Sequence, residues 1–348
     1  MTLQSSGTIR WSDIRNEFGA NISGGGVSLG RYRNNSSSFG NKNVGTLTDL
    51  PLDVGVPKSG TISASNFYSK KLNMVLDMYS GGTEFRVHCR TRYNDTSKVK
   101  VVGNYRSRPS NTSGTRVIVN INKTFGSEAY THITTCAVKT GDWNSTTDLD
   151  IEIGSNGKIY GAGGDGGDGG SANGSAGSDG KSGSTALGVQ YPCSINNLGR
   201  IQAGYGGGGG GGGRREYRRS GKKSGRWVGS SGGGGGGGAG VNPSPGWTSS
   251  FGGDSPQDSY GGGSNGSDGG DGVDITSGNG GGGGQDAGDG GDGAAVNNSS
   301  TKGDNGTVNG GTGGANGWAI ITTNATTDYT VSGSGNVVGR QKANVIVY

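Results

Sequence analysis

The chain has few hydrophobic residues, few prolines and few cysteines, and each shortage excludes a class of protein. Hydrophobic residues make up 28% of its 348 residues, whereas about 45–50% is usual for a globular protein even when glycine is counted, so any conventional core must be small. The 7 prolines exclude a collagen triple helix, which needs abundant proline and a strict Gly-X-Y repeat. The three cysteines Cys89, Cys136 and Cys193 do not make a disulfide framework.

Targeting signals are also missing. The first residues have neither the basic region nor the apolar region of a signal peptide, and no apolar run approaches the roughly 20 residues that a membrane helix needs. We therefore expect a protein made in a cytoplasm that does not leave by the general secretory route. Its net charge of +5 is uneven, because residues 1–160 carry 19 basic and 12 acidic residues whereas residues 161–317 carry 10 basic and 13 acidic ones.

Glycine is the residue in excess, and about 60 of the 81 glycines lie in residues 161–317. Each ordered residue costs roughly 1–2 kcal/mol of backbone entropy, and glycine buries no side chain in return. This block is therefore either disordered or held by backbone hydrogen bonds between neighbouring extended segments. A period of three, typical of a polyproline-II-type helix, favours order and predicts a solvated aspartate rim. The aspartates that keep this period are Asp165, Asp168, Asp268, Asp271, Asp274, Asp286, Asp289 and Asp292.

Two other regions carry patterns of their own. Residues 72–153 contain short β-branched segments separated by turn residues, which predicts a β-sandwich-like domain. In the first 70 residues a polar turn, a β-like pair and a short helical turn recur, beginning at Ser6 and again at Ser59. A third repeat brackets the glycine block and predicts β-hairpins with the glycine at a positive-φ turn. Its copies are Ile153, Gly157 and Ile159; Ile195, Gly199 and Ile201; and Val331, Gly335 and Val337.

These patterns resemble those of tailed-bacteriophage virion proteins. Residues 6–19, 27–32 and 56–68 are similar to the opening module of many such proteins, and residues 153–164 are similar to the entry of the glycine-rich domain of T-even-type tail-fibre adhesins. The resemblance covers residues 1–70 and 150–348 as pattern rather than identity. It implies stacked polyglycine-II helices with receptor-binding loops at the turns between them.

Two segments of the glycine block are candidate binding loops. Residues 214–227, between two glycine runs, hold seven cations, one anion and two aromatics, which favours an anionic cell-surface glycan; a solvated loop and a nucleic-acid-binding segment are the alternatives. Residues 242–260 combine prolines with isolated aromatics that either contact a receptor or fold against the glycine segments. The candidate receptor-binding residues are Arg214, Arg215, Tyr217, Arg218, Arg219, Lys222, Lys223, Arg226, Trp227, Trp247, Phe251 and Tyr260.

Metal binding and catalysis have little support in the sequence. Asp165 and Asp168 lack the apolar position of the calcium-binding nonapeptide. A pair of His-Cys clusters could form a zinc site only if their strands pair, and buried strand residues of these types are far commoner. No nucleophile motif or phosphate loop is present. The residues of the two clusters are His88 and Cys89, and His132 and Cys136.

The expected protein is therefore mainly β, with a small β-sandwich-like domain and a polyglycine-II array capped by β-hairpins. We expect attachment to other tail or fibre proteins through residues 1–70, a β domain at 71–160, the glycine-rich domain with binding loops at 161–317, and closing strands at 318–348. The predicted function is a non-enzymatic tail-fibre or tail-tip adhesin of the virion that binds a bacterial surface glycan or outer-membrane receptor, with no cofactor, no metal, no nucleic acid and no membrane insertion. The alternative is a purely structural fibre, collar or decoration protein.

Overall fold

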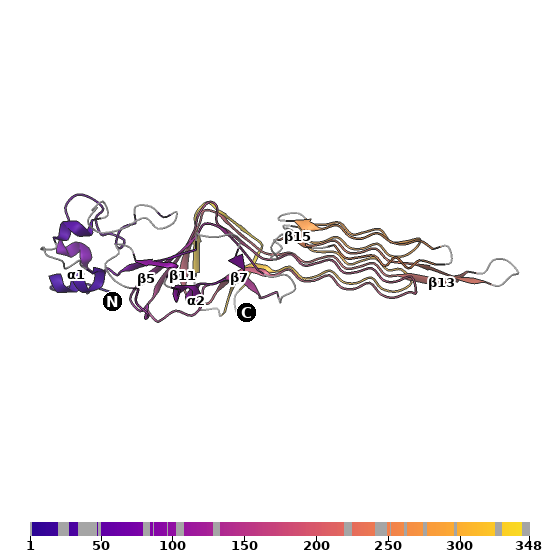
Figure 1. Ribbon diagram of the computed structural model, residues 1–348, viewed down its shortest axis with the longest axis horizontal. Helices are drawn as coiled ribbons and strands as arrows, with labels where there is room; N and C mark the ends of the chain where they lie inside the picture. The colour runs from indigo at the N-terminus through magenta and orange to yellow at the C-terminus, as the bar shows by residue number, and fades with distance from the viewer. Residues whose placement is uncertain are drawn as a thin grey trace.

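A computed structural model gives an elongated molecule with three successive parts (Figure 1). Short N-terminal helices lie at one end, parallel sheets form the middle, and a bundle of extended glycine-rich segments forms a rod at the other end. The structure describes residues 2–19, 28–33, 47, 50–78, 84–85, 87–95, 97–101, 108–127, 133–218, 225–240, 249–250, 252–260, 263–273, 277–295, 298–323 and 329–342.

The middle part is a parallel β-helix with three faces. Consecutive strands enter different sheets, and each strand pairs in parallel with its counterpart from the next turn of the coil. One face carries β1 (Asn73–Asp77), β5 (Arg116–Ile121), β8 (Asp148–Ile153), β11 (Cys193–Asn197) and β18 (Tyr329–Ser332), with β4 (Val99–Val101) antiparallel at its edge. The second carries β2 (Glu84–Phe85), β6 (Thr124–Gly126), β9 (Lys158–Tyr160), β12 (Arg200–Gln202) and β19 (Asn336–Val338). The third carries β3 (Val87–His88), β7 (Cys136–Lys139), β10 (Thr185–Val189), β17 (Trp318–Thr322) and β20 (Arg340–Lys342).

The predicted β-sandwich is therefore wrong, although the predicted strands and their alternation are present. In β8 the side chains of Leu149, Ile151 and Ile153 are buried while the residues between them are half-buried and polar. The inward-facing residues of all three sheets join one hydrophobic core. An antiparallel sandwich and a parallel β-helix share the same period of two, so alternation alone does not separate them.

The repeated glycines are corners of this coil and not hairpin turns. Gly199 follows β11 and precedes β12, which lie in different sheets. A Cβ atom on Gly199 would lie 2.0 Å from the carbonyl oxygen of Gly157, and one on Gly335 would lie 2.6 Å from that of Gly199. None of the repeated glycines Gly157, Gly199 and Gly335 has a positive φ. These positions are glycine because successive corners stack backbone on backbone, and the predicted positive-φ turn is wrong.

The glycine block leaves the β-helix from one corner. Residues 161–184 are inserted between β9 and β10, and residues 203–317 between β12 and β17. The inserted chain runs out and back in extended segments that form neither helix nor β-ladder over most of their length. Two antiparallel pairs lie within it, β13 (Arg214–Arg218) with β14 (Arg226–Ser230), and β15 (Ser249–Ser250) with β16 (Gly272–Val273).

Backbone hydrogen bonds join these segments with a period of three. In segment 203–213 the N–H groups of three successive residues, 207 to 209, donate to three different neighbours at 2.8–3.1 Å, and the pattern then repeats at 210 to 212. A Cβ atom on Gly208 would lie only 1.9 Å from the carbonyl oxygen of Gly291, so contact at this distance requires glycine. The segments bonded to 203–213 are 161–171, 175–184, 231–240, 288–295, 298–305 and 309–317.

Most aspartates of the period-three repeat are exposed along the rod, where several accept hydrogen bonds from neighbouring backbones; Asp165 is instead buried, and Asp274 lies outside the described residues. Asp179, outside that repeat, accepts from both the N–H and the hydroxyl of Thr312 at 2.7 and 2.8 Å. These bonds lower the pKa of Asp179. The exposed aspartates therefore link neighbouring segments of the rod by hydrogen bonds as well as forming a solvated edge. Other rim acceptors are Asp168 for Asp254 N, Asp268 for Ser255 N, Asp289 for Gly283 N and Asp292 for Gly280 N.

The N-terminal part packs three helical turns around an aromatic cluster. Its helices are α1 (Trp11–Phe18), η1 (Leu29–Tyr32) and η2 (Ala64–Phe67), and α2 (Cys89–Tyr93) follows β3. Rings of Trp11, Phe18, Tyr32 and Phe67 meet edge to face at centroid distances of 5.6–6.2 Å.

The predicted echo between the two halves of this module is present in the helical turns. The N-cap N–H of α1 bonds Asp13 and that of η2 bonds Asn66, each three residues into its helix.

Candidate functional site

The end of the rod farthest from the β-helix gathers several turns into one surface. The β13–β14 hairpin projects there (Figure 1). The N–H of Arg215 donates to Thr307 Oγ1 at 3.0 Å, and Tyr260 forms an isolated antiparallel bridge with Gly229. Ala172 N donates to Asp258 Oδ1 at 2.9 Å. Turns that are far apart in the sequence are therefore fixed around the base of the hairpin.

The hairpin carries an exposed aromatic pair. Tyr217 and Trp227 are direct cross-strand partners, with ring centroids 5.3 Å apart and planes inclined by 63°. They stay 47% and 49% exposed, and the guanidinium of Arg215 lies 4.4 Å from the Trp227 ring centroid. Aromatic rings with arginine are enriched where proteins bind one another or a sugar face. Such a pair on a solvent-facing hairpin adds little to the core and is available for binding.

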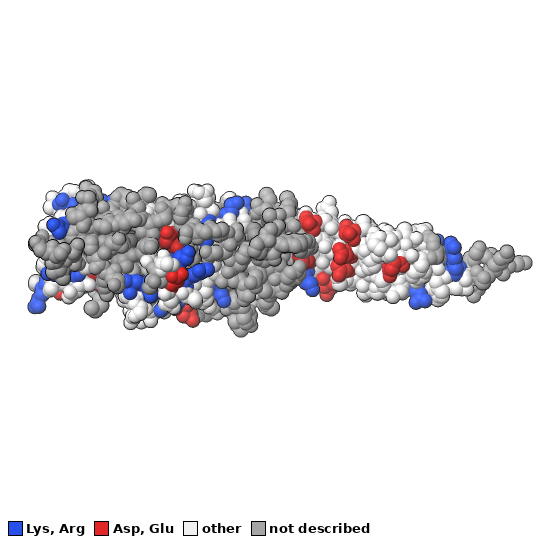
Figure 2. All heavy atoms as spheres, in the orientation of Figure 1, with Lys and Arg blue, Asp and Glu red and all other residues white. Residues whose placement is uncertain are grey.

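Acidic side chains already pair with two of the predicted arginines. Arg214 is mostly buried and forms ion pairs with Glu216 and Asp286. Arg218 pairs with the same two carboxylates, 3.2 Å from that of Asp286. The hydrogen bonds from Arg218 and Arg214 lower the pKa of Glu216. These contacts brace the hairpin against the turn at residues 284–287, whereas Arg226 is exposed on β14. Figure 2 shows the basic residues near this tip and the acidic ones farther back along the rod.

The structure brings together only part of the predicted site. Tyr260 lies beside the hairpin through its bridge to Gly229. Arg219, Lys222, Lys223, Trp247 and Phe251 lie outside the described residues. The described part of the second candidate loop begins with β15, which Figure 1 shows at the end of the rod nearer the β-helix. The described residues of that loop therefore reach both ends of the rod, with β15 near the β-helix and Tyr260 beside the hairpin.

Sequence reasoning missed the residues that brace the tip. Asp286, in a turn with φ of 56°, pairs with Arg214 and Arg218, and Thr307 anchors the start of β13. Asp286 was seen only as a member of the aspartate repeat. Its position at the start of the run Asp286, Asp289 and Asp292, next to Gln285, is the signal that could have marked a turn.

Other candidate chemistry finds structural explanations. His88 Nδ1 accepts from the N–H of Thr91 at 3.3 Å and caps α2. Burial lowers the pKa of His88 and raises the pKa of the Cys89 and Cys136 thiols to about 12. Within the described residues, no three His, Cys, Asp or Glu side chains are grouped to hold a metal ion; His132 lies outside them. No helix of the described chain is long and apolar enough to span a membrane.

The structure is that of a fibrous protein, a β-helix with a long rod whose far end exposes an aromatic pair. Residues 87–342, well over half of the chain, match the phage tail fibre adhesin Gp38 family, and the chain belongs to that family. No curated protein and no solved structure matches it.

The protein is accordingly a non-enzymatic phage tail fibre adhesin at the fibre tip, which attaches the virion to its host. The resemblance and the adhesin prediction are confirmed, and the family disfavours the purely structural alternative.

Proposed function

We propose that this adhesin contacts its host receptor with the distal tip of the glycine rod, and that residues 214–230 form the centre of the contact. The exposed Tyr217–Trp227 pair carries the proposal, because 47% and 49% of these large side chains remain in water after folding. Ring faces of this kind stack on sugars and on apolar protein surfaces. The receptor is a bacterial surface glycan or an outer-membrane protein.

The rod that presents this tip is an array of polyglycine-II helices in our proposal. Two observations support this proposal. The backbone N–H groups of segment 203–213 point to three different neighbours in turn and repeat every three residues, and six segments among the described residues are hydrogen-bonded to it. A helix with about three residues per turn sends its N–H groups in three directions, and segments of glycine pack closely enough for all three to bond. Such an array is stiff because neighbouring segments share hydrogen bonds along their length, so the tip is presented with little conformational freedom.

Attachment to the fibre is assigned to residues 1–70 in this proposal. The Gp38 match covers residues 87–342 and leaves this module outside it. Val54 is 60% exposed, the most exposed large hydrophobic side chain in the described part of the chain, and suits a protein partner. The proposed division of the rest is a β domain at 71–160, the glycine-rich domain at 161–317 and closing strands at 318–348, although β10, β11 and β12 within 161–317 belong to the sheets of the β-helix.

Binding of labelled protein to intact host cells tests the tip. Trp227→Ala is expected to reduce binding at least tenfold, as for an aromatic residue at the centre of an interface. Leu198→Ala is the matched control, since Leu198 is also 49% exposed but lies at a corner of the β-helix. Equal binding by both variants would remove the hairpin from the contact. Loss in both would point to a folding defect, which a melting curve of each variant detects.

Incorporation into particles tests the N-terminal assignment separately. Val54→Asp is expected to lower the amount of adhesin on assembled virions while leaving the cell binding of the purified protein unchanged. Leu198→Asp serves as the control for adding an exposed charge. If Val54→Asp is incorporated as well as the wild type, this surface is not the attachment site.

A further inference from the structure

A cavity opens at the junction between the β-helix and the rod, and the topology explains why it exists. In the turns that contain β9 and β12, the chain leaves the β-helix corner and enters the glycine rod. In the last turn, β19 passes into β20 through Gly339 alone, with φ of 115°. No glycine segment starts from this corner. A cavity of about 560 Å³ remains between the corner and the neighbouring glycine segments, within the roughly 300–1,000 Å³ of small-ligand sites.

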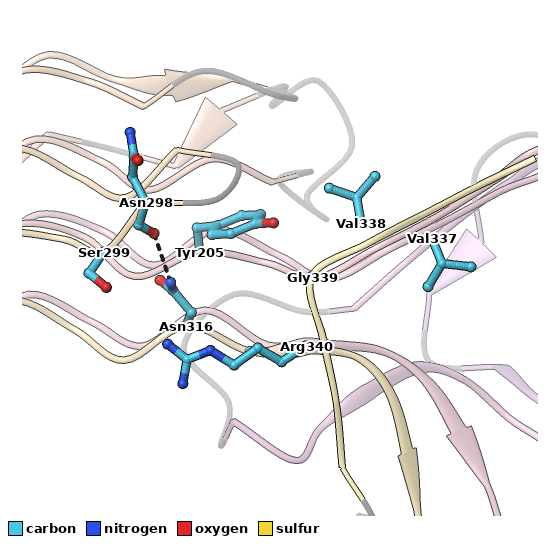
Figure 3. Close-up of a pocket in the computed structure, with 9 residues that line it drawn as sticks. Tyr205, Asn298, Ser299, Asn316, Val337, Val338, Gly339 and Arg340 are labelled. Atoms are coloured by element: carbon cyan, nitrogen blue, oxygen red, sulfur yellow. Dashed lines mark hydrogen bonds between the residues drawn. The ribbon is translucent and has the colours of Figure 1, made fainter.

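The walls of the cavity are held in place by the fold. Asn316 Oδ1 accepts from Gly206 N at 3.0 Å, and its Nδ2 donates to the carbonyl oxygen of Asn298 at 2.9 Å (Figure 3). The N–H of Ala203 bonds the carbonyl oxygen of Val338 at 2.9 Å and so joins the rod to the corner. A ligand would therefore meet a preformed site and would not have to order it.

The lining combines polar side chains with Val337 and Val338, and it carries one charge. Arg340 contributes a guanidinium that Figure 3 shows extending toward Asn316, supported by the Trp318 ring 5.8 Å away. Within the described part of the chain, no carboxylate lies at ion-pair distance from Arg340 and none lines the cavity. The hydroxyl of Ser299 and the amide of Asn298 complete the polar surface, while the ring of Tyr205 is almost wholly buried in the wall.

We propose that this cavity binds a small oxyanion that carries hydroxyl groups, namely a sugar acid or a sugar phosphate. The guanidinium of Arg340 pairs with the carboxylate or phosphate through its planar fork. Ser299 and Asn298, both exposed, bond the hydroxyl groups. The site lies at the fibre-proximal end of the rod and is separate from the hairpin, so it does not depend on the proposed receptor contact.

Calorimetric titration of the full-length protein tests the site with glucuronate, glucose 6-phosphate and glucose. Either anionic sugar is expected to bind with one site per chain and glucose at least tenfold more weakly; the two anions distinguish carboxylate from phosphate recognition. Arg340→Gln is expected to lose at least about tenfold in affinity, as when a charged hydrogen-bond partner is removed. Arg10→Gln is the matched control, because it makes the same charge change at an exposed residue beside α1, away from both the cavity and the hairpin.

Two results would overturn the proposal. One is the absence of binding by the wild type to either anion at millimolar concentrations. The other is an equal loss in Arg340→Gln and Arg10→Gln, which would show general charge attraction. Ser299→Tyr fills the cavity without changing the charge, and so tests the site independently of any folding effect of the arginine change. Loss of sugar binding by this variant with an unchanged melting temperature supports the site. Retention of binding contradicts the site.

Discussion

A methyl group added at the centre of the rod should destabilise it severely. The Cβ of Gly208→Ala would lie 1.9 Å from the carbonyl oxygen of Gly291, and real Cβ contacts are essentially never below 3.0 Å. Segments 203–213 and 288–295 must therefore separate by about 1.1 Å. Three backbone hydrogen bonds of 2.7–2.9 Å join these segments, and such a shift stretches them beyond bonding distance. Each hydrogen bond contributes roughly 0.5–1.5 kcal/mol, so losing all three should lower the free energy of unfolding by about 1.5–4.5 kcal/mol.

Gly282→Ala is the matched control in the same array. Its Cβ would find its nearest neighbour, Ser267 Oγ, 3.8 Å away, and Gly282 has no positive φ. Alanine there should be neutral or stabilising by a few tenths of a kcal/mol, because it restricts the unfolded chain. Scanning calorimetry of both variants provides the comparison. If Gly208→Ala melts within one degree of Gly282→Ala, the close backbone packing described here is incorrect.

Two further predictions concern pH and the rim of the rod. The pKa of His88 is lowered in the fold, so its contribution to stability should be complete above the ordinary histidine pKa of about 6.5 and should be lost as the pH falls, because protonated Nδ1 cannot accept the hydrogen bond from Thr91. Between pH 8 and pH 5 the melting temperature should therefore fall less steeply in His88→Gln than in the wild type. Parallel curves for the two proteins would exclude His88 as the cause. Asp179→Ala should cost roughly 0.5–1 kcal/mol by removing an exposed acceptor for Thr312, whereas Asp179→Asn keeps an acceptor. Because the pKa of Asp179 is lowered, this contribution should be present at neutral pH and disappear in acid, and an equal cost at pH 7 and below pH 3 would refute it.

The local elements were predictable from sequence because they depend on neighbouring residues. The alternation in β8, the period-three glycine segments and the helical turns around Asp13 and Asn66 all follow from local pattern. The pairing of strands was not predictable, because partners such as β12 and β19 are separated by the whole inserted block. The corner glycines carried the signal: Gly199 and Gly335 repeat because they stack, but the same spacing also fits a hairpin.

The tip was predictable as a segment but not in its electrostatics. The position of residues 214–227 between two glycine runs indicated a far turn, and the hairpin is there. Its composition suggested an anion-binding cluster, yet Arg214 and Arg218 pair with Asp286, a residue about 70 positions away in sequence. Only the folding of the rod brings that carboxylate to the hairpin. The aromatic pair therefore remains the better supported part of the contact.

Hydrogen exchange of the adhesin, measured free and bound to outer-membrane vesicles of its host, tests the central claim most directly. The account predicts that binding slows exchange in the hairpin of β13 and β14 and in the adjacent turns near Tyr260 and Thr307, with no change in the β-helix. Protection confined to the β-helix or to residues 50–78, with the hairpin unchanged, would contradict it.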